Sequence, residues 1–340
     1  MIRVGLIGTG YWGPNVANSF KTTGRAEVAW VCDLHPDVLA TFSKRHPDAR
    51  TTENYLDVIA DPTVDAVAVV TPTATHFDIA RRALEAGKHV LVEKPITTDA
   101  AQAEALIASA EKAGRVLMVG HVFSYNTTVL ALKDLVRGNV LGRISHLNLV
   151  RTNLGPVRTD VNALWDLASH DAYIMMDLLD EEPESVSALG RSYLNSEVED
   201  VVFSTFTFPS GTIAHVHASW LDPRKVRQIT VVGDRKMAVW DDLNTAEPIR
   251  VFDKHVEMPP RGALEGTFIE HKTLVVDSGS QVIDVVHNRP LQAECEHFID
   301  CIEKNAKPRS DGRAGLAVVR ALLAAHESMR RGGAPVKLDR

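Results

Sequence analysis

Three glycines with a fixed spacing lie close to the amino terminus, in the run Gly8-Thr9-Gly10-Tyr11-Trp12-Gly13. The pattern Gly-x-Gly-x-x-Gly is typical of a dinucleotide-binding turn when it follows a strand and opens a helix. Gly8 then permits a tight turn, Gly10 lets backbone approach a pyrophosphate, and Gly13 lets the helix pack on the strand. The N–H groups that begin the helix attract the anion. A plain turn between a strand and a helix is the structural alternative.

Asp33 follows the second apolar run, 20 residues after Gly13. A carboxylate at this place can accept hydrogen bonds from both hydroxyls of the adenosine ribose. It would also repel a 2′-phosphate, so Asp33 favours NAD over NADP as the cofactor. A capping role at the helix that begins near Pro36 is the alternative, and the two roles are compatible.

Lys94 stands in the run Glu93-Lys94-Pro95, directly after the apolar residues 90–92. Ligands of open parallel sheets bind beyond the carboxyl ends of the strands, so this position places Lys94 in that crevice. Burial or a neighbouring cation can lower the pKa of such an amine toward the range that suits proton transfer. A surface lysine held by a turn is the alternative.

Asp166 and His170 are four residues apart within a predicted helix, residues 163–179. Residues with this spacing share one helix face. A carboxylate beside an imidazole can orient it as a general base, and histidine suits proton transfer near neutral pH. A capping aspartate with a buried histidine is the alternative.

Short apolar runs alternate with helical stretches over the first 120 residues, a pattern typical of a parallel sheet covered by helices. The expected strands are residues 4–7, 27–31, 66–70, 90–92 and 116–119. The expected helices are residues 14–20, 37–45, 54–60, 75–86 and 98–114. The sequence therefore predicts an α/β protein whose amino-terminal part is a doubly wound Rossmann sheet.

The pattern changes after residue 120, where long stretches of β-type sequence follow two predicted helices. These helices are residues 126–137 and 163–179, and the expected strands are residues 144–152, 185–193, 201–208, 212–220 and 226–232. Pro209-Ser210-Gly211 is typical of a hairpin turn, so the sheet is expected to be large and mainly antiparallel. Helices are expected again at residues 291–303 and 314–330, and a loop at residues 259–266.

Length and charge limit the possible classes of protein. The chain has 340 residues, 37 Lys and Arg against 44 Asp and Glu, and a net charge of −7. Two domains fit this length: a dinucleotide-binding domain, residues 1–120, and an α+β domain for substrate binding and oligomerisation, residues 121–340. The last helix could pack back on the first domain. The acidic balance argues against a nucleic-acid partner, because such binding depends on cationic side chains.

Three cysteines are present, namely Cys32, Cys295 and Cys301. This odd and sparse set predicts buried free thiols in a reducing compartment, without a disulfide framework. No metal is expected, since no Cys-x-x-Cys or His-x-x-x-His spacing accompanies the cysteines. We also find no signal peptide and no apolar window long enough to cross a membrane, so a cytoplasmic location is expected.

Four motifs together resemble the Gfo/Idh/MocA family of oxidoreductases. They are the glycine run from Gly8 to Gly13, Thr71-Pro72-Thr73-x-x-His76, Glu93-Lys94-Pro95, and Asp166-x-x-x-His170. The resemblance extends over the whole chain, including Asp311-Gly312-Arg313 before the last helix.

This resemblance implies a role for each matching residue. Lys94 would contact both the substrate and the nicotinamide, Asp166 and His170 would face the reacting carbon, and the loop with Pro72, Thr73 and His76 would line the cofactor. The predicted NAD site comprises Gly8, Gly10, Tyr11, Trp12, Gly13, Asp33, Thr71, Pro72, Thr73, His76, Glu93 and Lys94. Association through the second sheet, as a homodimer or homotetramer, is also implied.

The expected reaction is the NAD-dependent oxidation of a hydroxyl group. His170 is expected to act as the general base, Lys94 to stabilise the developing alkoxide, and Asp166 to position the substrate or the imidazole. Lys94 could instead be the base, and the sequence leaves both assignments open.

Residues 151–171 are expected to determine the substrate specificity. They offer a polyol several hydrogen-bonding groups and a stacking face, through Arg151, Asn153, Arg158, Thr159, Asp160, Asn162 and Trp165. Arg151 and Arg158 could hold a diphosphate; each could instead be a solvated charge or be tied to an acidic neighbour. The stretch resembles UDP-N-acetylglucosamine 3-dehydrogenase-like members of the family, which act on the C3 hydroxyl of sugar nucleotides.

Three functions remain open at this point. The first is a dehydrogenase of a sugar or sugar nucleotide, and the second is the same chemistry on a free cyclitol or monosaccharide, including the reductase direction. The third is a non-catalytic NAD-binding sensor, which would have no need to keep Lys94 and His170. Because the ligands are anions, the acidic total is expected on the outer surface and the site is expected to be locally positive.

Overall fold

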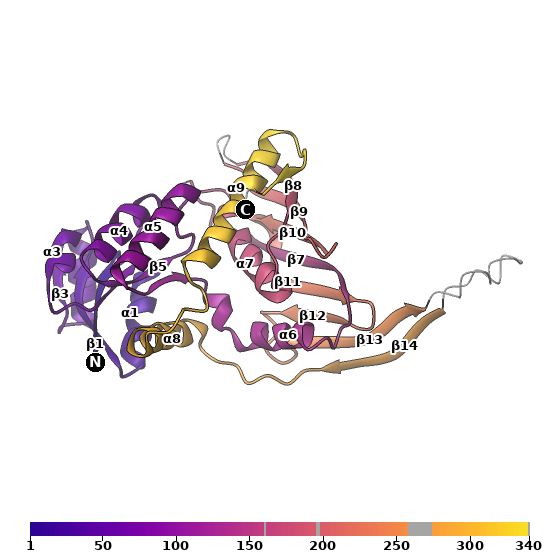
Figure 1. The fold of residues 1–340 in the computed structure, drawn as a ribbon, viewed down its shortest axis with the longest axis horizontal. Helices are drawn as coiled ribbons and strands as arrows, with labels where there is room; N and C mark the ends of the chain where they lie inside the picture. The colour runs from indigo at the N-terminus through magenta and orange to yellow at the C-terminus, as the bar shows by residue number, and fades with distance from the viewer. Residues whose placement is uncertain (160, 195–197, 258–273, 339–340) are drawn as a thin grey trace, which may run out of the picture. The chain divides into compact units, whose positions relative to one another are not determined.

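The computed structural model describes residues 1–340 except 160, 195–197, 258–273 and 339–340. The chain forms two compact units (Figure 1). The first contains Met1–Asn126 with Asn288–Leu323, and the second contains Thr127–His287 with Ala324–Arg340. The first unit thus extends a few residues beyond the expected boundary at 120. It also includes residues 288–323, which the predicted domain 121–340 had counted with the second unit. The predicted loop at residues 259–266 lies outside the described residues.

The sheet of the first unit is parallel and has six strands in the order β3-β2-β1-β4-β5-β6. The strands are β1 (Ile2–Ile7), β2 (Ala26–Cys32), β3 (Arg50–Thr52), β4 (Ala66–Val69), β5 (His89–Glu93) and β6 (Leu117–Gly120). The chain places β2 and β3 on one side of β1 and then returns to place β4 on the other side. The expected Rossmann architecture is therefore confirmed. At such a reversal, the carboxyl ends of β1 and β4 border a ligand crevice.

Helices cover both faces of this sheet. They are α1 (Gly13–Thr22), α2 (Pro36–Arg45), α3 (Tyr55–Ala60), α4 (His76–Glu85) and α5 (Ala100–Ala113), with short 3-10 turns η1 (Thr73–Thr75) and η2 (Val122–Tyr125). Figure 1 shows α3, α4 and α5 along one face. The ends of α5 follow from its sequence, since the Asp99 carboxylate accepts from the Gln102 amide at 2.9 Å and Gly114 ends the helix with φ of +61°.

A helix from the last quarter of the chain, α8 (Pro290–Lys304), completes the core of the first unit. Its buried residues Cys295, Phe298 and Ile299 share one cluster with the α1 and β1 side chains. Phe298 meets Phe20 of α1 edge to face, with ring centroids 6.2 Å apart. The amphipathic pattern predicts this helix but not the core that receives it. All three cysteines are buried and free.

The second unit contains a nine-stranded sheet in the order β14-β13-β12-β11-β7-β10-β9-β8-β15. The strands are β7 (Ile144–Leu154), β8 (Ser185–Arg191), β9 (Val201–Thr207), β10 (Ile213–Ser219), β11 (Leu221–Gly233), β12 (Met237–Asp241), β13 (Ile249–Glu257), β14 (Leu274–Val282) and β15 (Val336–Lys337). Among the described strand pairs of this nine-stranded sheet, only β7 and β10 run parallel. The mainly antiparallel sheet and the hairpin at residues 209–211 are therefore confirmed.

The helices α6 (Thr127–Arg137) and α7 (Ser169–Leu179) pack on this sheet, and α7 is preceded by a π-helical turn, η3 (Leu164–Ala168). The last helix, α9 (Gly312–Arg330), is divided between the two units after Leu323. On the sheet, Phe203 is 45% exposed and stacks on His217 with centroids 4.4 Å apart, which leaves a mixed face on β9 and β10. Association of copies through this sheet stays a prediction.

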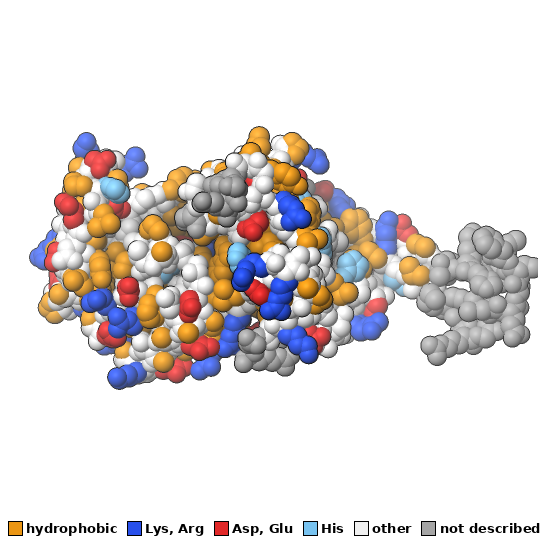
Figure 2. Space-filling model, turned by 90° about the horizontal axis from the view of Figure 1, so that it is seen from above, with side chains coloured by type: hydrophobic (Ala, Val, Ile, Leu, Met, Phe, Trp, Pro, Cys, Tyr) orange, Lys and Arg blue, Asp and Glu red, His pale blue; other side chains and the backbone are white. Residues whose placement is uncertain are grey.

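Charged side chains of both signs are interspersed over the face drawn in Figure 2 rather than gathered in one region. Among the described residues, every helix is too short or too polar to cross a membrane.

Candidate active site

The three glycines of the first loop have different surroundings. Gly8 has a positive φ of +96°, and a Cβ there would lie 2.6 Å from the Val70 carbonyl oxygen. A Cβ on Gly13 would lie 2.5 Å from the Gly8 oxygen, whereas one on Gly10 would meet nothing within 4 Å. Gly8 and Gly13 are therefore required by packing within the chain. At Gly10 the backbone is open, as it must be if a ligand approaches it.

The start of α1 is suited to an anion. The helix begins at Gly13, with Trp12 as its N-cap residue, Pro14 in its first turn and no acidic residue in that turn. No side chain of the described residues caps this end. The first N–H groups of a helix lack partners within the helix, so these groups and the helix dipole can hold a pyrophosphate.

Asp33 joins the end of β2 to the glycine loop. Its Oδ2 accepts from both the backbone N–H and the hydroxyl of Thr9, each at 2.8 Å, and its Oδ1 accepts from the His35 amide at 3.1 Å. Thr9 is buried and was not among the predicted site residues. Its hydroxyl fixes the carboxylate that we expect to contact the ribose. A hollow of about 180 Å³ lies between Thr9 and α2.

His76 lies between the loops that follow the neighbouring strands β4 and β5. Its Nδ1 is 2.9 Å from the Pro95 carbonyl oxygen, and its Nε2 is 2.8 Å from the Thr71 carbonyl oxygen. The side chain is only 1% exposed, and burial lowers its pKa against the opposing effect of these carbonyls. The structure thus gives His76 contacts with the loops after β4 and β5. Direct contact with the cofactor stays a prediction for it, as for Thr71, Pro72 and Thr73.

Glu93 connects Lys94 with the glycine loop. Its Oε2 accepts from the Lys94 amide at 3.2 Å, and it also accepts a hydrogen bond from the Trp12 side chain. The carboxyl lies against Gly120, where a Cβ would be only 3.1 Å away. Burial raises the pKa of Glu93 to about 7, although the charge of Lys94 and both hydrogen bonds oppose the rise.

Two further titratable residues belong to this neighbourhood and were missed in the sequence. His121 directly follows β6 and is buried; burial and the charge of Lys94 lower its pKa to about 3. Glu294 of α8 is 1% exposed, its Oε2 has no hydrogen-bond partner among the described residues, and burial together with the charge of Glu93 raises its pKa. His121 could have been found from its place after a strand. Glu294 could not, because nothing in its local sequence places α8 here.

In the second unit, Asp166 is held by two neighbours. Its Oδ1 accepts from Arg158 at 3.3 Å, and its Oδ2 accepts from the indole N–H of Trp220 at 3.2 Å. Asp166 lies in the π-helical turn η3 and His170 in the first turn of α7. The predicted single α-helix is therefore interrupted between an expected orienting residue and an expected base, a feature common near functional sites.

Several of the predicted substrate residues form hydrogen bonds or ion pairs with other residues of the second unit. Arg151 is buried and donates from Nε and Nη2 to the Asp171 carboxylate at 2.8 to 3.1 Å. Asn162 donates to Glu199 at 2.7 Å and accepts from the Trp165 amide at 3.1 Å. The tie to an acidic neighbour, one of the two alternatives for Arg151, is thus what the structure shows. Contact of Arg151 with substrate stays a prediction.

The remaining residues of this stretch lie in three places: Asn153 near the end of β7, Arg158 on the connection that follows, and Trp165 in η3. Asn153 donates to the Gly155 carbonyl, Arg158 is 39% exposed at its side chain, and Trp165 is 7% exposed. Asp160 lies outside the described residues. The structure thus groups the glycine loop, Asp33, His76, Glu93 and Lys94 in the first unit, and Arg158, Asp166 and Trp220 in the second. That Lys94, Asp166 and His170 act on one substrate stays a prediction.

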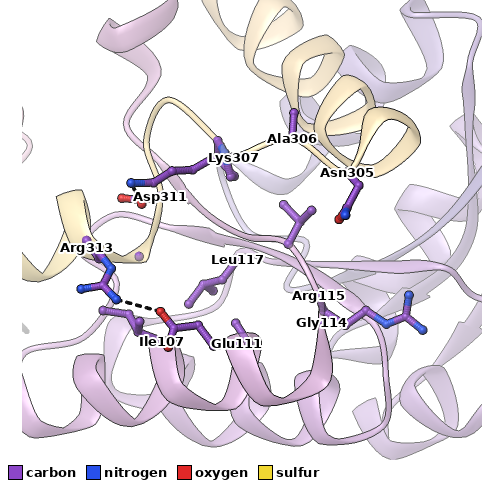
Figure 3. A pocket seen from close by; sticks show the side chains of 14 residues that line it. Ile107, Glu111, Gly114, Arg115, Leu117, Asn305, Ala306, Lys307, Asp311 and Arg313 are labelled. Atoms are coloured by element: carbon purple, nitrogen blue, oxygen red, sulfur yellow. Dashed lines mark hydrogen bonds and ion pairs between the residues drawn. The ribbon is translucent and has the colours of Figure 1, made fainter.

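A second hollow, of about 520 Å³, lies at the amino-terminal end of β6, away from the carboxyl ends that bear these residues. Figure 3 shows its charged side chains, of which Arg313 pairs with Glu111 at 2.8 Å. Lys307 pairs with Asp311 at 2.9 Å. Arg115 also lines this hollow. The hollow lies at the opposite end of β6 from the carboxyl ends of the strands, where ligands of open parallel sheets bind, so we do not place the cofactor there.

The reversal of strand order, the open Gly10 and the carboxylate that ends β2 define a dinucleotide-binding protein of the Rossmann type with a second, mainly antiparallel domain. The chain belongs to the Gfo/Idh/MocA oxidoreductase family. Residues 2–121 match the family described as "Oxidoreductase family, NAD-binding Rossmann fold", and residues 129–239 match its C-terminal domain. The cofactor of this domain is accordingly NAD, and the protein is an oxidoreductase.

One curated relative covers nearly the whole chain, and another covers about two thirds of it. A UDP-N-acetylglucosamine 3-dehydrogenase of Acidithiobacillus ferrooxidans is 28% identical over 323 residues, 95% of each protein. A myo-inositol 2-dehydrogenase of Thermotoga maritima is 25% identical over 228 residues, covering 64% of this chain and 68% of that protein.

Solved structures share the fold. The structure of UDP-N-acetylglucosamine 3-dehydrogenase GnnA from Acidithiobacillus ferrooxidans has a TM-score of 0.81 at 27% identity, covering 97% of this chain and 99% of that one. The WlbA dehydrogenase from Bordetella pertussis, in complex with NADH and UDP-GlcNAcA, has a TM-score of 0.81 at 22% identity, covering 100% and 99%.

Proposed function

We propose that this protein oxidises the C3 hydroxyl of the sugar in a UDP-activated sugar, with NAD as the hydride acceptor. The similarity to a UDP-N-acetylglucosamine 3-dehydrogenase over 95% of both chains is the observation that carries the choice of substrate. The reaction type rests on the family and on the residues at the carboxyl ends of β1, β2 and β5.

The first unit fits NAD residue by residue. The open backbone at Gly10 and the uncapped start of α1 suit the pyrophosphate, and Asp33 suits the ribose hydroxyls. When bound, NAD supplies the carbon that accepts the hydride. The chain must then hold the substrate hydroxyl and remove its proton.

Three side chains are assigned to these tasks. His170 takes the hydroxyl proton as general base, and the carbon–hydrogen electron pair leaves as hydride, so the carbinol becomes a ketone. Lys94 stabilises the developing alkoxide by its charge. Asp166, fixed by Arg158 and Trp220, positions the substrate or the imidazole. Exchange of the two roles, with Lys94 as the base, is the alternative assignment.

Turnover of a defined panel tests the substrate. The protein is incubated with NAD and, separately, UDP-sugars, the matching free sugars and inositols, and the absorbance of the reduced cofactor is followed. We expect reduction with a UDP-sugar, and trapping the product with borodeuteride should place the label at C3. A label at another carbon would overturn the C3 assignment.

A dehydrogenase of a free cyclitol or monosaccharide is the second candidate, favoured by the similarity to myo-inositol 2-dehydrogenase. Turnover of free polyols alone would reject the sugar-nucleotide proposal in its favour. Binding of NAD without turnover of any panel member would favour the sensor instead. Against a sensor stands the presence of Lys94, Asp166 and His170.

The cofactor preference is tested by titration with NAD and with NADP in the absence of substrate. The Asp33 carboxylate is expected to accept hydrogen bonds from both ribose hydroxyls of NAD. The 2′-phosphate of NADP would replace one hydroxyl and would be repelled by the negative charge of Asp33. We expect NAD to bind more tightly. Tighter binding of NADP would contradict the role given to Asp33.

A further inference from the structure

We propose that His76 is a positioning residue: by holding the Pro95 carbonyl, its imidazole keeps the neighbouring Lys94 in place for catalysis. The proposal rests on the function proposed for Lys94. In this role His76 acts on the reaction only through Lys94 and does not itself contact the substrate.

The His76 side chain connects two loops that are far apart in the sequence, the loop after β4 and the loop after β5. The residue begins α4, so its backbone is fixed by the helix, and its ring reaches the Pro95 oxygen at 2.9 Å and the Thr71 oxygen at 2.8 Å. Lys94 directly precedes Pro95. A displacement of the Pro95 peptide is therefore transmitted to the backbone that carries the proposed alkoxide-stabilising lysine.

The two loops differ in how much they depend on His76. The loop after β4 has its own ties, because the Thr75 hydroxyl lies 2.7 Å from the Thr71 hydroxyl and donates to the Pro72 carbonyl at 2.8 Å. The Pro95 carbonyl faces a ring that is 1% exposed, so water has little access to replace it. The Lys94 amide is also held, by Glu93 at 3.2 Å, but that bond does not fix the Pro95 carbonyl. Loss of the ring should therefore displace the Pro95 carbonyl, and with it the backbone beside Lys94, more than the loop that lines the cofactor.

The two nitrogens of the ring can be replaced one at a time. An asparagine amide reaches about as far as Nδ1, which faces Pro95, and a glutamine amide reaches about as far as Nε2, which faces Thr71. Because the lowered pKa of His76 keeps its imidazole neutral, the ring has one N–H, and we assign the tautomer in which Nδ1 donates to the Pro95 carbonyl. His76→Asn would then present an amide N–H toward the Pro95 carbonyl, and His76→Gln would present one toward the Thr71 carbonyl. A role limited to filling space would not distinguish these variants.

His89 offers a matched control. It begins β5, the strand whose other end leads into Lys94 and Pro95. Its Nδ1 accepts from the Val116 amide at 3.0 Å, so it too fixes backbone beside β5, but at the amino-terminal end, away from Lys94. His89→Ala removes a hydrogen bond between a histidine ring and the backbone, with the ring as acceptor, without touching the proposed site.

The experiment measures kcat, KM, NAD affinity and Tm for His76→Ala, His76→Asn, His76→Gln and His89→Ala. We expect His76→Ala to lower kcat by about 10- to 100-fold, as small misplacements of catalytic groups do, with a much smaller change in NAD affinity. His76→Asn should recover most of kcat and His76→Gln should not, while His89→Ala should change Tm only. Wild-type kcat in His76→Ala, or equal kcat in the Asn and Gln variants, would overturn the proposal.

A second measurement separates this proposal from the proposed function. The rate at which an amine reagent labels Lys94, followed by mass spectrometry, needs no substrate. We expect the Lys94 rate to change in His76→Ala and in His76→Gln but not in His89→Ala. If the wild type turns over no panel substrate, the proposed function fails; an unchanged Lys94 rate in His76→Ala and His76→Gln then overturns the positioning role as well. If His76→Ala does not fold, the Asn and Gln variants carry both comparisons.

Discussion

The candidate residues of the first unit follow one strand after another at the same edge of a parallel sheet, whereas those of the second unit come from one continuous stretch of chain. Gly8 and Gly10 follow β1, Asp33 follows β2, and Lys94 follows β5. In the second unit, Arg151 lies in β7, Asp166 in η3 and His170 in α7.

The polar partners of the two regions differ in the same way. In the first unit, side chains such as Asp33 and His76 bond mainly to backbone, so each fixes a loop. In the second unit, Arg151 pairs with Asp171 and Asn162 with Glu199, side chain to side chain. We infer that changes in the first unit alter binding or turnover separately from stability, and that changes in the second unit cost stability first.

The largest effect is expected from Asp171→Ala in the second unit. The change leaves the Arg151 guanidinium, 4% exposed at its side chain, without the carboxylate that accepts its hydrogen bonds. Removal of one partner from a buried ion pair costs about 3–5 kcal/mol, because the other charge stays buried. Urea unfolding of the variant and the wild type measures the difference.

An exposed pair in the same unit is the control for this measurement. Glu327 pairs with Arg330 at 3.0 Å and with Arg331 at 2.6 Å on the surface of α9. Glu327→Ala should cost far less than Asp171→Ala, because ion pairs at the surface contribute little to stability. Equal losses for the two variants would contradict the structural role that we give to Asp171, and with it the contrast between the units.

Lys94→Ala tests the first unit, where we expect a change to reduce turnover rather than stability. Loss of a charge that stabilises the developing alkoxide should lower kcat by at least about 10²–10³-fold. NAD affinity should stay close to that of the wild type, since the groups that hold the pyrophosphate and the ribose are untouched. Steady-state kinetics and NAD titration measure both. Lys112→Ala, on the exposed side of α5, is the control. An active Lys94→Ala enzyme would exclude the role.

Glu294→Gln tests whether the first unit also contains a polar group that lowers stability. Burial and the charge of Glu93 raise the pKa of the Glu294 carboxyl in the folded state. The folded chain then keeps a proton that the unfolded chain has released, so this group lowers stability progressively as pH rises above the unfolded carboxyl pKa, about 4.3. Glutamine does not titrate and removes that loss.

The expected result is a difference in unfolding free energy that grows with pH. From pH 5 upward, Glu294→Gln should gain on the wild type by up to about 1.4 kcal/mol per pH unit, the limit for one proton. Unfolding curves at several pH values measure this gain. Parallel pH profiles for the two proteins would show that Glu294 is no less acidic in the folded state.

The features that sequence could predict are those set by local pattern. Strand–turn–helix periodicity with Gly8, Gly10 and Gly13 predicts the first loop, and the position of Asp33 and Lys94 after apolar runs predicts their edge of the sheet. Topology then brings these residues to one edge, because parallel strands end there. The same reasoning would have found His121.

The features that sequence could not predict depend on partners far along the chain. Nothing local places Glu294 and α8 in the first unit, or pairs Arg151 with Asp171. The π-helical turn before α7 likewise escapes a pattern that assumes α-helical periodicity throughout. The strands β12 to β14 were not expected either, and β3 has no apolar run that could indicate it.

The smallest effect is expected from Thr9→Val, which tests how finely the first unit prepares its site. Valine keeps the shape of threonine and the backbone N–H bond to Asp33, and it removes only the hydroxyl bond of 2.8 Å. Because the lost bond only orients the Asp33 carboxylate, and the backbone N–H bond remains, NAD binding should weaken by about 0.5–1.5 kcal/mol, the net value of a typical hydrogen bond. We expect kcat to stay within about twofold, since the change lies at the ribose and not at the reacting carbon.

Thr9→Ser should restore NAD affinity, because serine returns the hydroxyl that bonds to Asp33. If Thr9→Val instead lowered Tm as much as Asp171→Ala, the two units would not differ in the way argued above. If it left NAD affinity unchanged, the backbone N–H of Thr9 would suffice to orient the carboxylate. Asp33 would then be held through backbone N–H groups, those of Thr9 and His35, and the contrast with the side-chain pairs of the second unit would be sharper.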